Sequence, residues 1–128
     1  MVLGGVTFCL DKPGRVHVTS VVRSDGSLDV TGWAVHEYFG GVMAGDALGT
    51  LAANGLNHSP DPLTFVCRGS EPEPALYELL VELRATPRTS VSSGFTIHYV
   101  SDGEPGELTI PYRVIICANP TDPKCQPS

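Results

Sequence analysis

The sequence predicts an all-β protein, a two-layer antiparallel β-sandwich of immunoglobulin-like architecture with seven or eight short strands and at most one short helix. Three observations predict this fold. Apolar and polar residues alternate over most of the chain, turn residues interrupt the alternation at regular intervals, and glycine and proline account for 14 and 11 of the 128 residues. A chain of this length suits one domain. We assign residues 1–117 to that domain and residues 118–128 to a proline-rich C-terminal tail.

The first predicted hairpin lies between residues 16 and 32. Its two arms, residues 16–21 and 28–32, carry small or apolar side chains at alternate positions. Residues 24–27 between them read Ser-Asp-Gly-Ser, which supplies the positive φ values of a tight turn. We therefore expect the two arms to pair with each other.

A second hairpin is predicted closer to the C-terminus. Residues 95–99 carry Phe, Ile and Tyr at alternate positions, residues 101–106 form the turn, and residues 107–110 return. Pro111 then lacks the N–H that a central strand needs. We therefore expect residues 112–117 to form a separate strand, or one that bends across to the other sheet.

Residues 75–84 fit both a helix and a strand. Helical spacing gathers four leucines on one face, Leu76, Leu79, Leu80 and Leu83, and helix propensity favours this reading. Strand spacing gathers Tyr77, Leu79, Val81 and Leu83 on one face and Glu78, Glu82 and Arg84 on the other, with only Leu80 out of place. Because strands are expected on both sides, we predict a strand.

The connection formed by residues 37–62 differs in composition from the rest of the chain. It is rich in glycine and small apolar residues and has no strand pattern. Asp46 is placed to cap a short helix over residues 47–52, and Asn54-Gly55 to end it. A connection of this length between two strands usually has a function or is covered by a binding partner. We take it as the candidate binding segment.

The four cysteines form an even set without the spacing of zinc ligands, at Cys9, Cys67, Cys117 and Cys125. Disulfides are therefore predicted, with four buried thiols as the alternative. Of the three possible pairings we favour Cys67 with Cys117 and Cys9 with Cys125, because Cys67 and Cys117 each end an apolar run where a strand leaves the core.

Charge and hydropathy narrow the class of partner and the compartment. The net charge is −6, and the eight lysines and arginines are scattered singly, which disfavours nucleic acid and anionic lipid as partners. The sequence contains no run of about 18 apolar residues, so it predicts no membrane-spanning helix. Because disulfides persist in oxidising compartments, we expect a secreted or cell-surface protein whose signal segment is not present in this chain.

Six short motifs follow one another in the chain: Thr7-Phe8-Cys9, Leu48-Gly49-Thr50-Leu51, Phe65-Val66-Cys67, Tyr77-Glu78-Leu79, the run Gly94-Phe95-Thr96-Ile97-His98-Tyr99, and Pro111 leading to Ile116-Cys117. Their order loosely resembles that of small exported proteins and lipoproteins of actinobacteria, a group to which we attach no function. The resemblance implies export, a β-rich fold and disulfides, and it implies no catalytic residue.

The familiar motifs of enzymes are missing. His36-Glu37 begins like the helix of a zinc protease, but Gly40 stands where the second histidine would be. Asp25-Gly26 and Asp102-Gly103 lack the further ligands of a calcium loop and are read as turns. No nucleophile elbow, phosphate-binding loop or dinucleotide motif occurs. We therefore predict no enzyme and no cofactor.

Two sets of residues are candidate binding sites. The aromatic cluster Trp33, Tyr38 and Phe39 leads into the glycine-rich segment, and it either plugs and covers the sandwich or presents an exposed patch to a protein or peptide partner, formed by Tyr38, Phe39, Val42 and Met43. We predict a non-enzymatic extracytoplasmic binding or adaptor domain that uses residues 37–62. The alternative is a copper, zinc or small-ligand carrier that uses His17 and His98 on neighbouring strands, with Met43 as a further ligand.

Overall fold

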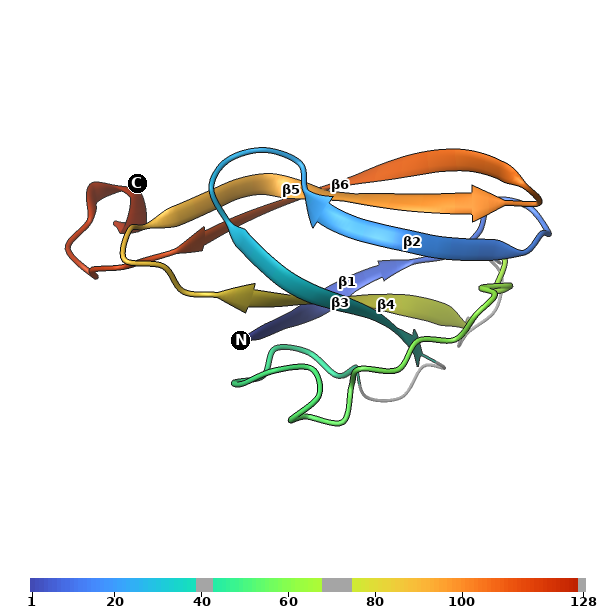
Figure 1. Cartoon of the computed structure of the whole chain (residues 1–128), viewed down its shortest axis with the longest axis horizontal. Coiled ribbons are helices and arrows are strands. Elements are labelled where there is room, and N and C mark those ends of the chain that lie inside the picture. The colour runs from blue at the N-terminus through green and yellow to red at the C-terminus, as the bar shows by residue number, and fades with distance from the viewer. Residues whose placement is uncertain (39–42, 68–74, 127–128) are drawn as a thin grey trace.

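The computed structural model describes residues 1–38, 43–67 and 75–126. Two three-stranded antiparallel sheets pack against each other, so the predicted all-β, two-layer fold is confirmed (Figure 1). One sheet has the order β1-β4-β3 and the other the order β2-β5-β6. The bounds are β1 Val2–Phe8, β2 Val16–Arg23, β3 Asp29–Tyr38, β4 Leu76–Arg84, β5 Ser90–Ser101 and β6 Glu104–Ile116, followed by a short 3-10 helix, η1, at Pro123–Cys125.

The described residues form six strands, fewer than the seven or eight predicted. The apolar run that ends at Cys67 makes single bridges instead of a ladder, with Leu63 opposite Val16 and Val66 opposite Leu10. The Tyr77 hydroxyl on β4 accepts hydrogen bonds from the backbone of Thr64 and Phe65 and so holds this run across one end of the sandwich. Within the described residues, no helix is long and apolar enough to cross a lipid bilayer.

The first predicted hairpin is wrong, because β2 and β3 belong to different sheets. Backbone N–H groups of the turn between them donate to carbonyl groups of β5. Ser24 donates to Gly94, and both Ser27 and Leu28 donate to Val91. Leu28 is fully buried between the sheets. The chain does bend at residues 24–27, with positive φ at Gly26, but it crosses there from one layer to the other instead of folding back beside itself.

The second hairpin is confirmed, and it extends further than predicted. The pairing of β5 with β6 continues to Ser101 and Glu104, so the turn consists of Asp102 and Gly103 alone. Both have positive φ, 49° and 84°, as a two-residue hairpin turn of the favoured hand requires.

The expected break at Pro111 is wrong. β6 runs through this proline without leaving its sheet, and the ladder absorbs it by a register shift between Ser92 and Gly94 on β5. Because β6 is an edge strand, one side of its backbone needs no partner, and a missing N–H on that side costs little.

The strand predicted for residues 75–84 is confirmed as β4, the central strand of its sheet. Its apolar face, which includes Leu79, Val81 and Leu83, packs between the two sheets against residues such as Phe95. The opposite face carries Glu78, Leu80 and Glu82, and Leu80 is fully buried there too. Leu80, the exception on the predicted polar face, therefore belongs to a second, smaller core.

The predicted short helix over residues 47–52 is wrong. Ala47 forms a bridge with Val2 of β1, and the chain then makes a single turn in which the N–H of Leu56 donates to the carbonyl of Leu51. Gly55 adopts the expected left-handed conformation, with φ of 68°. The Asp46 side chain accepts a hydrogen bond from Gly4 of β1 instead of capping a helix, so contact with the sheet overrides local propensity.

All four cysteines form disulfides, as predicted, but the predicted pairing is wrong. The bonds join Cys9 to Cys67 and Cys117 to Cys125. The backbone around Leu10 exchanges hydrogen bonds with Phe65 and Cys67, which brings Cys9 and Cys67 to a Cα separation of 5.1 Å. The chain leading to Cys67 and the tail beyond β6 lie at opposite ends of the sandwich, which rules out the favoured pairing (Figure 1). The C-terminal tail is thus tied to the end of its own strand.

The two disulfides should contribute unequally to stability. Cys9–Cys67 spans 58 residues and Cys117–Cys125 spans 8, and a longer closed loop removes more entropy from the unfolded chain. We expect the double variant Cys9→Ala/Cys67→Ala to lose about 4 kcal/mol of unfolding free energy and Cys117→Ala/Cys125→Ala about 2.5 kcal/mol. Urea unfolding of both variants measures this, and a larger loss from the C-terminal pair would contradict it.

Candidate functional site

The segment formed by residues 43–56, here called the covering segment, lies against the outer face of the β1-β4-β3 sheet. In Figure 1 it is the green chain that runs beside β1, β3 and β4. It closes the second core, in which Leu51 packs with three sheet residues, Val2, Ala34 and Leu80, and with Ala44, Ala47 and Leu56 at the margin. A connection without regular structure is therefore seated on the sheet by apolar contacts of its own.

The fully buried carboxylate of Glu78 is the main polar link between the covering segment and the sheet. Its Oε1 accepts the N–H of Ala44 at 2.8 Å, and its Oε2 accepts the N–H groups of Gly5 at 2.8 Å and Gly45 at 3.0 Å. Three backbone donors satisfy a charge that would otherwise be costly to bury. The carboxylate thereby joins β1, β4 and the covering segment at one point.

Only glycine at position 4 lets the covering segment and the Glu78 carboxylate come this close to β1. A Cβ atom there would stand 2.4 Å from the carbonyl oxygen of Gly45 and 2.8 Å from Oε2 of Glu78. The first of these contacts is with backbone, which cannot swing aside. Gly4 of β1 therefore leaves room for the covering segment, and the neighbouring Gly5 donates its N–H to Glu78.

His36 stands beside the Glu78 carboxylate. It lies opposite Glu78 in the β3–β4 register, with its Nδ1 3.4 Å from Oε1. This nitrogen is buried and has no hydrogen-bond partner among the residues that the structure describes. The three N–H groups that the carboxylate accepts come from β1 and the covering segment, so Glu78 has a structural role in holding that segment.

Two further carboxylates hold the covering segment at its edges. Glu82 accepts the N–H of Leu51 on Oε1 and the hydroxyl of Thr31 on Oε2, each at 2.7 Å. The Thr31 hydroxyl and then the Leu51 amide lower the pKa of Glu82, because both bonds favour its charged form. Asp46 accepts the N–H of Gly4 at 2.9 Å. The covering segment is therefore fixed at several separate points.

Leu48 projects from this fixed backbone into solvent, with 89% of its surface exposed. The preceding residue, Ala47, exchanges two backbone hydrogen bonds with Val2, and the side-chain amide of Asn54 donates to the Leu48 carbonyl at 2.8 Å. A large apolar side chain is thus presented on an ordered backbone. Sequence reasoning missed it because the short helix predicted over residues 47–52 gives no indication that Leu48 lies in solvent.

The predicted aromatic patch is described only in part. Tyr38 ends β3 opposite Leu76 and is half-buried, and Met43 at the start of the covering segment is half-buried as well. Phe39 and Val42 lie outside the described residues. Trp33 packs against the core between the sheets. The patch as a whole stays a prediction, and Leu48 is the apolar residue that the described segment presents most openly.

His17 and His98, the candidate metal ligands, each lie next to a carboxylate. Nδ1 of His17 is 2.5 Å from Oδ1 of Asp61, and Nδ1 of His98 is 3.6 Å from Oε2 of Glu107. Both histidines lie on the β2-β5-β6 sheet, whereas Met43 adjoins the other sheet. Over residues 1–38, 43–67 and 75–126, no three His, Cys, Asp or Glu side chains are grouped so that they could hold a metal ion.

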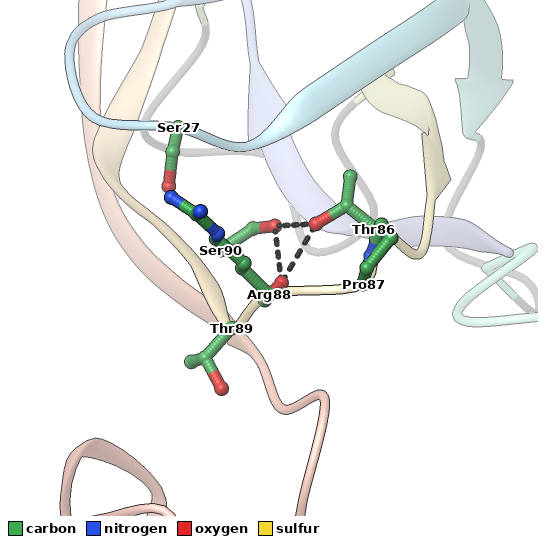
Figure 2. A pocket seen from close by; sticks show the side chains of 6 residues that line it. All are labelled: Ser27, Thr86, Pro87, Arg88, Thr89 and Ser90. Carbon is green, nitrogen blue, oxygen red and sulfur yellow. Dashed lines mark hydrogen bonds between the residues drawn. The ribbon is translucent and has the colours of Figure 1, made fainter.

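A hollow of about 430 Å³ lies beside the turn between β4 and β5 (Figure 2). In Figure 2 the hydroxyls of Thr86 and Ser90 face each other and the carbonyl of Arg88. The two hydroxyl oxygens are 2.9 Å apart, and they lie 2.7 and 3.3 Å from the Arg88 carbonyl oxygen. Ser27 across the hollow accepts the N–H of Val91. These hydroxyls are engaged in shaping the turn, so we do not assign a binding function to this hollow.

The chain matches no known family model, no curated protein and no solved structure.

Replacing Glu78 should loosen the covering segment. In Glu78→Gln the amide would turn an N–H donor toward at least one of the three backbone donors, and the charge that strengthens these bonds would be lost. We expect a loss of about 3 kcal/mol in unfolding free energy by urea titration. The control is Glu107→Gln, on the more exposed side chain beside His98, which should change stability by less than about 0.5 kcal/mol. Equal losses in the two variants would contradict the role assigned to Glu78.

Glu82 should make stability depend on pH in the acid range. Because its pKa is lower in the folded protein than in the unfolded chain, its contribution is complete above the ordinary glutamate pKa and is lost as pH falls through the lowered value. We expect wild type to be more stable than Glu82→Gln at pH 7 and the difference to shrink below about pH 4. Urea unfolding of both proteins from pH 7 to pH 3 measures this. A difference that stays constant over that range would contradict it.

Proposed function

We propose that this chain is a non-enzymatic binding domain that acts outside the cytoplasm and engages a protein or peptide partner through residues 37–62, with Leu48 as its main apolar contact. The observation that carries the proposal is the 89% exposure of Leu48 on a segment held by Glu78, Glu82, Asp46 and Val2. A binding loop that is ordered before it meets its partner loses less entropy on association than a flexible one.

The chemistry around the covering segment supports binding more than catalysis. Glu78 and Glu82 both use their carboxylate oxygens as acceptors for backbone or hydroxyl donors of the fold. These contacts set the path of the backbone, and Leu48 extends beyond it. Large apolar side chains that insert into a pocket on a partner commonly provide much of the affinity of a protein interface.

The two disulfides support a location in an oxidising compartment, where such bonds form and persist. The Cys9–Cys67 bond also closes the end of the connection that contains the covering segment. We therefore propose that the domain is exported, and that the bond helps to keep the binding segment ordered there.

The strand order supports an immunoglobulin-like architecture. A constant-type immunoglobulin domain has the sheets A-B-E-D and C-F-G. If β1 is equated with strand B, the orders β1-β4-β3 and β2-β5-β6 become B-E-D and C-F-G, which is that arrangement without strand A. Trp33 on β3 and the Cys9–Cys67 bond do not occupy the positions of the immunoglobulin tryptophan and disulfide, so the proposed likeness is one of architecture.

A peptide library displayed on phage tests the proposed binding segment. We expect selection on the wild-type protein to enrich peptides whose affinity falls at least about tenfold in Leu48→Ser, since about 1.4 kcal/mol of apolar contact is lost. Leu108→Ser, at another exposed leucine on β6, is the matched control and should leave affinity unchanged. Failure to enrich any peptide, or peptides that bind Leu48→Ser as tightly as wild type, would overturn the proposal. The unfolding free energy of Leu48→Ser should stay within about 0.5 kcal/mol of wild type.

A further inference from the structure

A small cavity of about 220 Å³ opens at the edge of the sandwich where β2 and β3 face each other. Its walls are Val18 from β2 and Trp33 and Val35 from β3, and its roof is the chain from Ser59 to Asp61. Three apolar side chains therefore form the inner walls, and Asp61 is one of the roof residues.

The roof of this cavity is fixed at both ends. The Ser59 hydroxyl accepts the N–H of Val35 at 2.9 Å, which ties the roof to the free edge of β3. Leu63, two residues after Asp61, exchanges backbone hydrogen bonds with Val16 of β2 at 2.7 and 3.0 Å. Hydrogen bonds on both sides of the cavity thus fix the path of the chain that forms its roof.

Asp61 places a negative charge beside the cavity. Its side chain is 67% exposed, and His17 is its only polar partner among the residues that the structure describes. The chain as a whole has a net charge of −6. A cationic group is therefore attracted to this site and an anionic group repelled.

The walls suit an organic cation better than a metal ion. The face of an indole attracts a positively charged group by its quadrupole, and valine side chains favour contact with alkyl groups. The volume is smaller than the roughly 300–1,000 Å³ of sites for drug-sized ligands. A short alkyl chain that ends in an ammonium group matches the apolar walls, the aromatic ring and the carboxylate together.

We propose that the cavity between Val18, Trp33 and Asp61 binds an alkylammonium group, either as a free small amine or as the end of a lysine side chain from a protein partner. This site is separate from Leu48, and the proposal does not depend on the proposed function. The Leu48→Ser variant should bind amines as wild type does, so the two proposals can fail independently.

Trp33 is the only tryptophan of the chain, so its fluorescence reports on this cavity directly. We expect n-butylammonium chloride, titrated at constant ionic strength, to change the emission in a saturable way in the millimolar range. n-Butanol, which lacks the charge, should bind at least about fivefold more weakly. A change that grows linearly without saturation, or equal binding of the alcohol and the ammonium ion, would overturn the proposal.

Two variants locate the binding in this cavity. Asp61→Asn keeps an acceptor for His17 and should weaken n-butylammonium binding about fivefold, whereas Asp11→Asn, which removes an equal charge from another exposed position, should leave it unchanged. Val18→Met fills the cavity from β2 and should abolish binding even if Asp61→Asn proves unstable. Unaltered binding in Asp61→Asn or in Val18→Met would overturn the proposal.

Two peptides distinguish the sources of the amine. If acetyl-Gly-Lys-Gly-amide binds at least as tightly as n-butylammonium and its Nε-acetylated form does not bind, the site takes a lysine side chain. If n-butylammonium binds and both peptides fail, the site takes a free amine. Binding of the acetylated peptide as tight as that of the lysine peptide would contradict the requirement for a positive charge.

Discussion

The buried carboxylate of Glu78 is the interaction on which the candidate binding surface depends. It lies on the central strand β4, on the face that points away from the main core, and it accepts N–H groups from β1 and from the covering segment. An unsatisfied carboxylate at this depth would be strongly destabilising. The covering segment supplies two of the three donors that satisfy this carboxylate, and the absence of a side chain at Gly4 makes the contact possible.

This constraint explains how a connection without regular structure can still present a defined surface. Apolar contacts of Leu51 with Val2, Ala34 and Leu80 exclude water from one side of the covering segment, and the carboxylates fix its backbone. Leu48 then stands out from the ordered chain. At the edge of the same connection, Ser59 and Leu63 fix the roof over the cavity beside Trp33. Two distinct surfaces thus arise from one connection that follows the outside of the sandwich.

Local patterns in the sequence predicted the local structure well and the long-range structure poorly. Alternation identified β4 against a competing helical pattern, and the β5–β6 turn followed from Asp102-Gly103. The turn after β2 was also located, but alternation does not tell whether two strands pair or stack, so β2 and β3 were placed in one hairpin. Spacing likewise showed that four cysteines would pair without showing which, because Cys9 and Cys67 meet only through the bridge of Leu10 with Val66.

The candidate site was predictable only as a region. The length and composition of residues 37–62 indicated a binding segment, yet Leu48 was not identified, because its exposure depends on Asp46 and Ala47 bonding to β1 instead of starting a helix. Leu80 on the polar face of β4 was the available signal, since a buried leucine there requires a cover. Glu78 gave no signal of its own, because a strand glutamate between apolar neighbours is ordinarily exposed to solvent.

Native-state amide hydrogen exchange of the wild-type protein tests the role of Glu78 most directly. If its carboxylate seats the covering segment, the N–H groups of Gly5, Ala44 and Gly45 exchange far more slowly than those of an unstructured chain, and protection of all three falls together in Glu78→Gln. Exchange of Ala44 and Gly45 at the rate of an unstructured peptide in the wild-type protein would contradict the account.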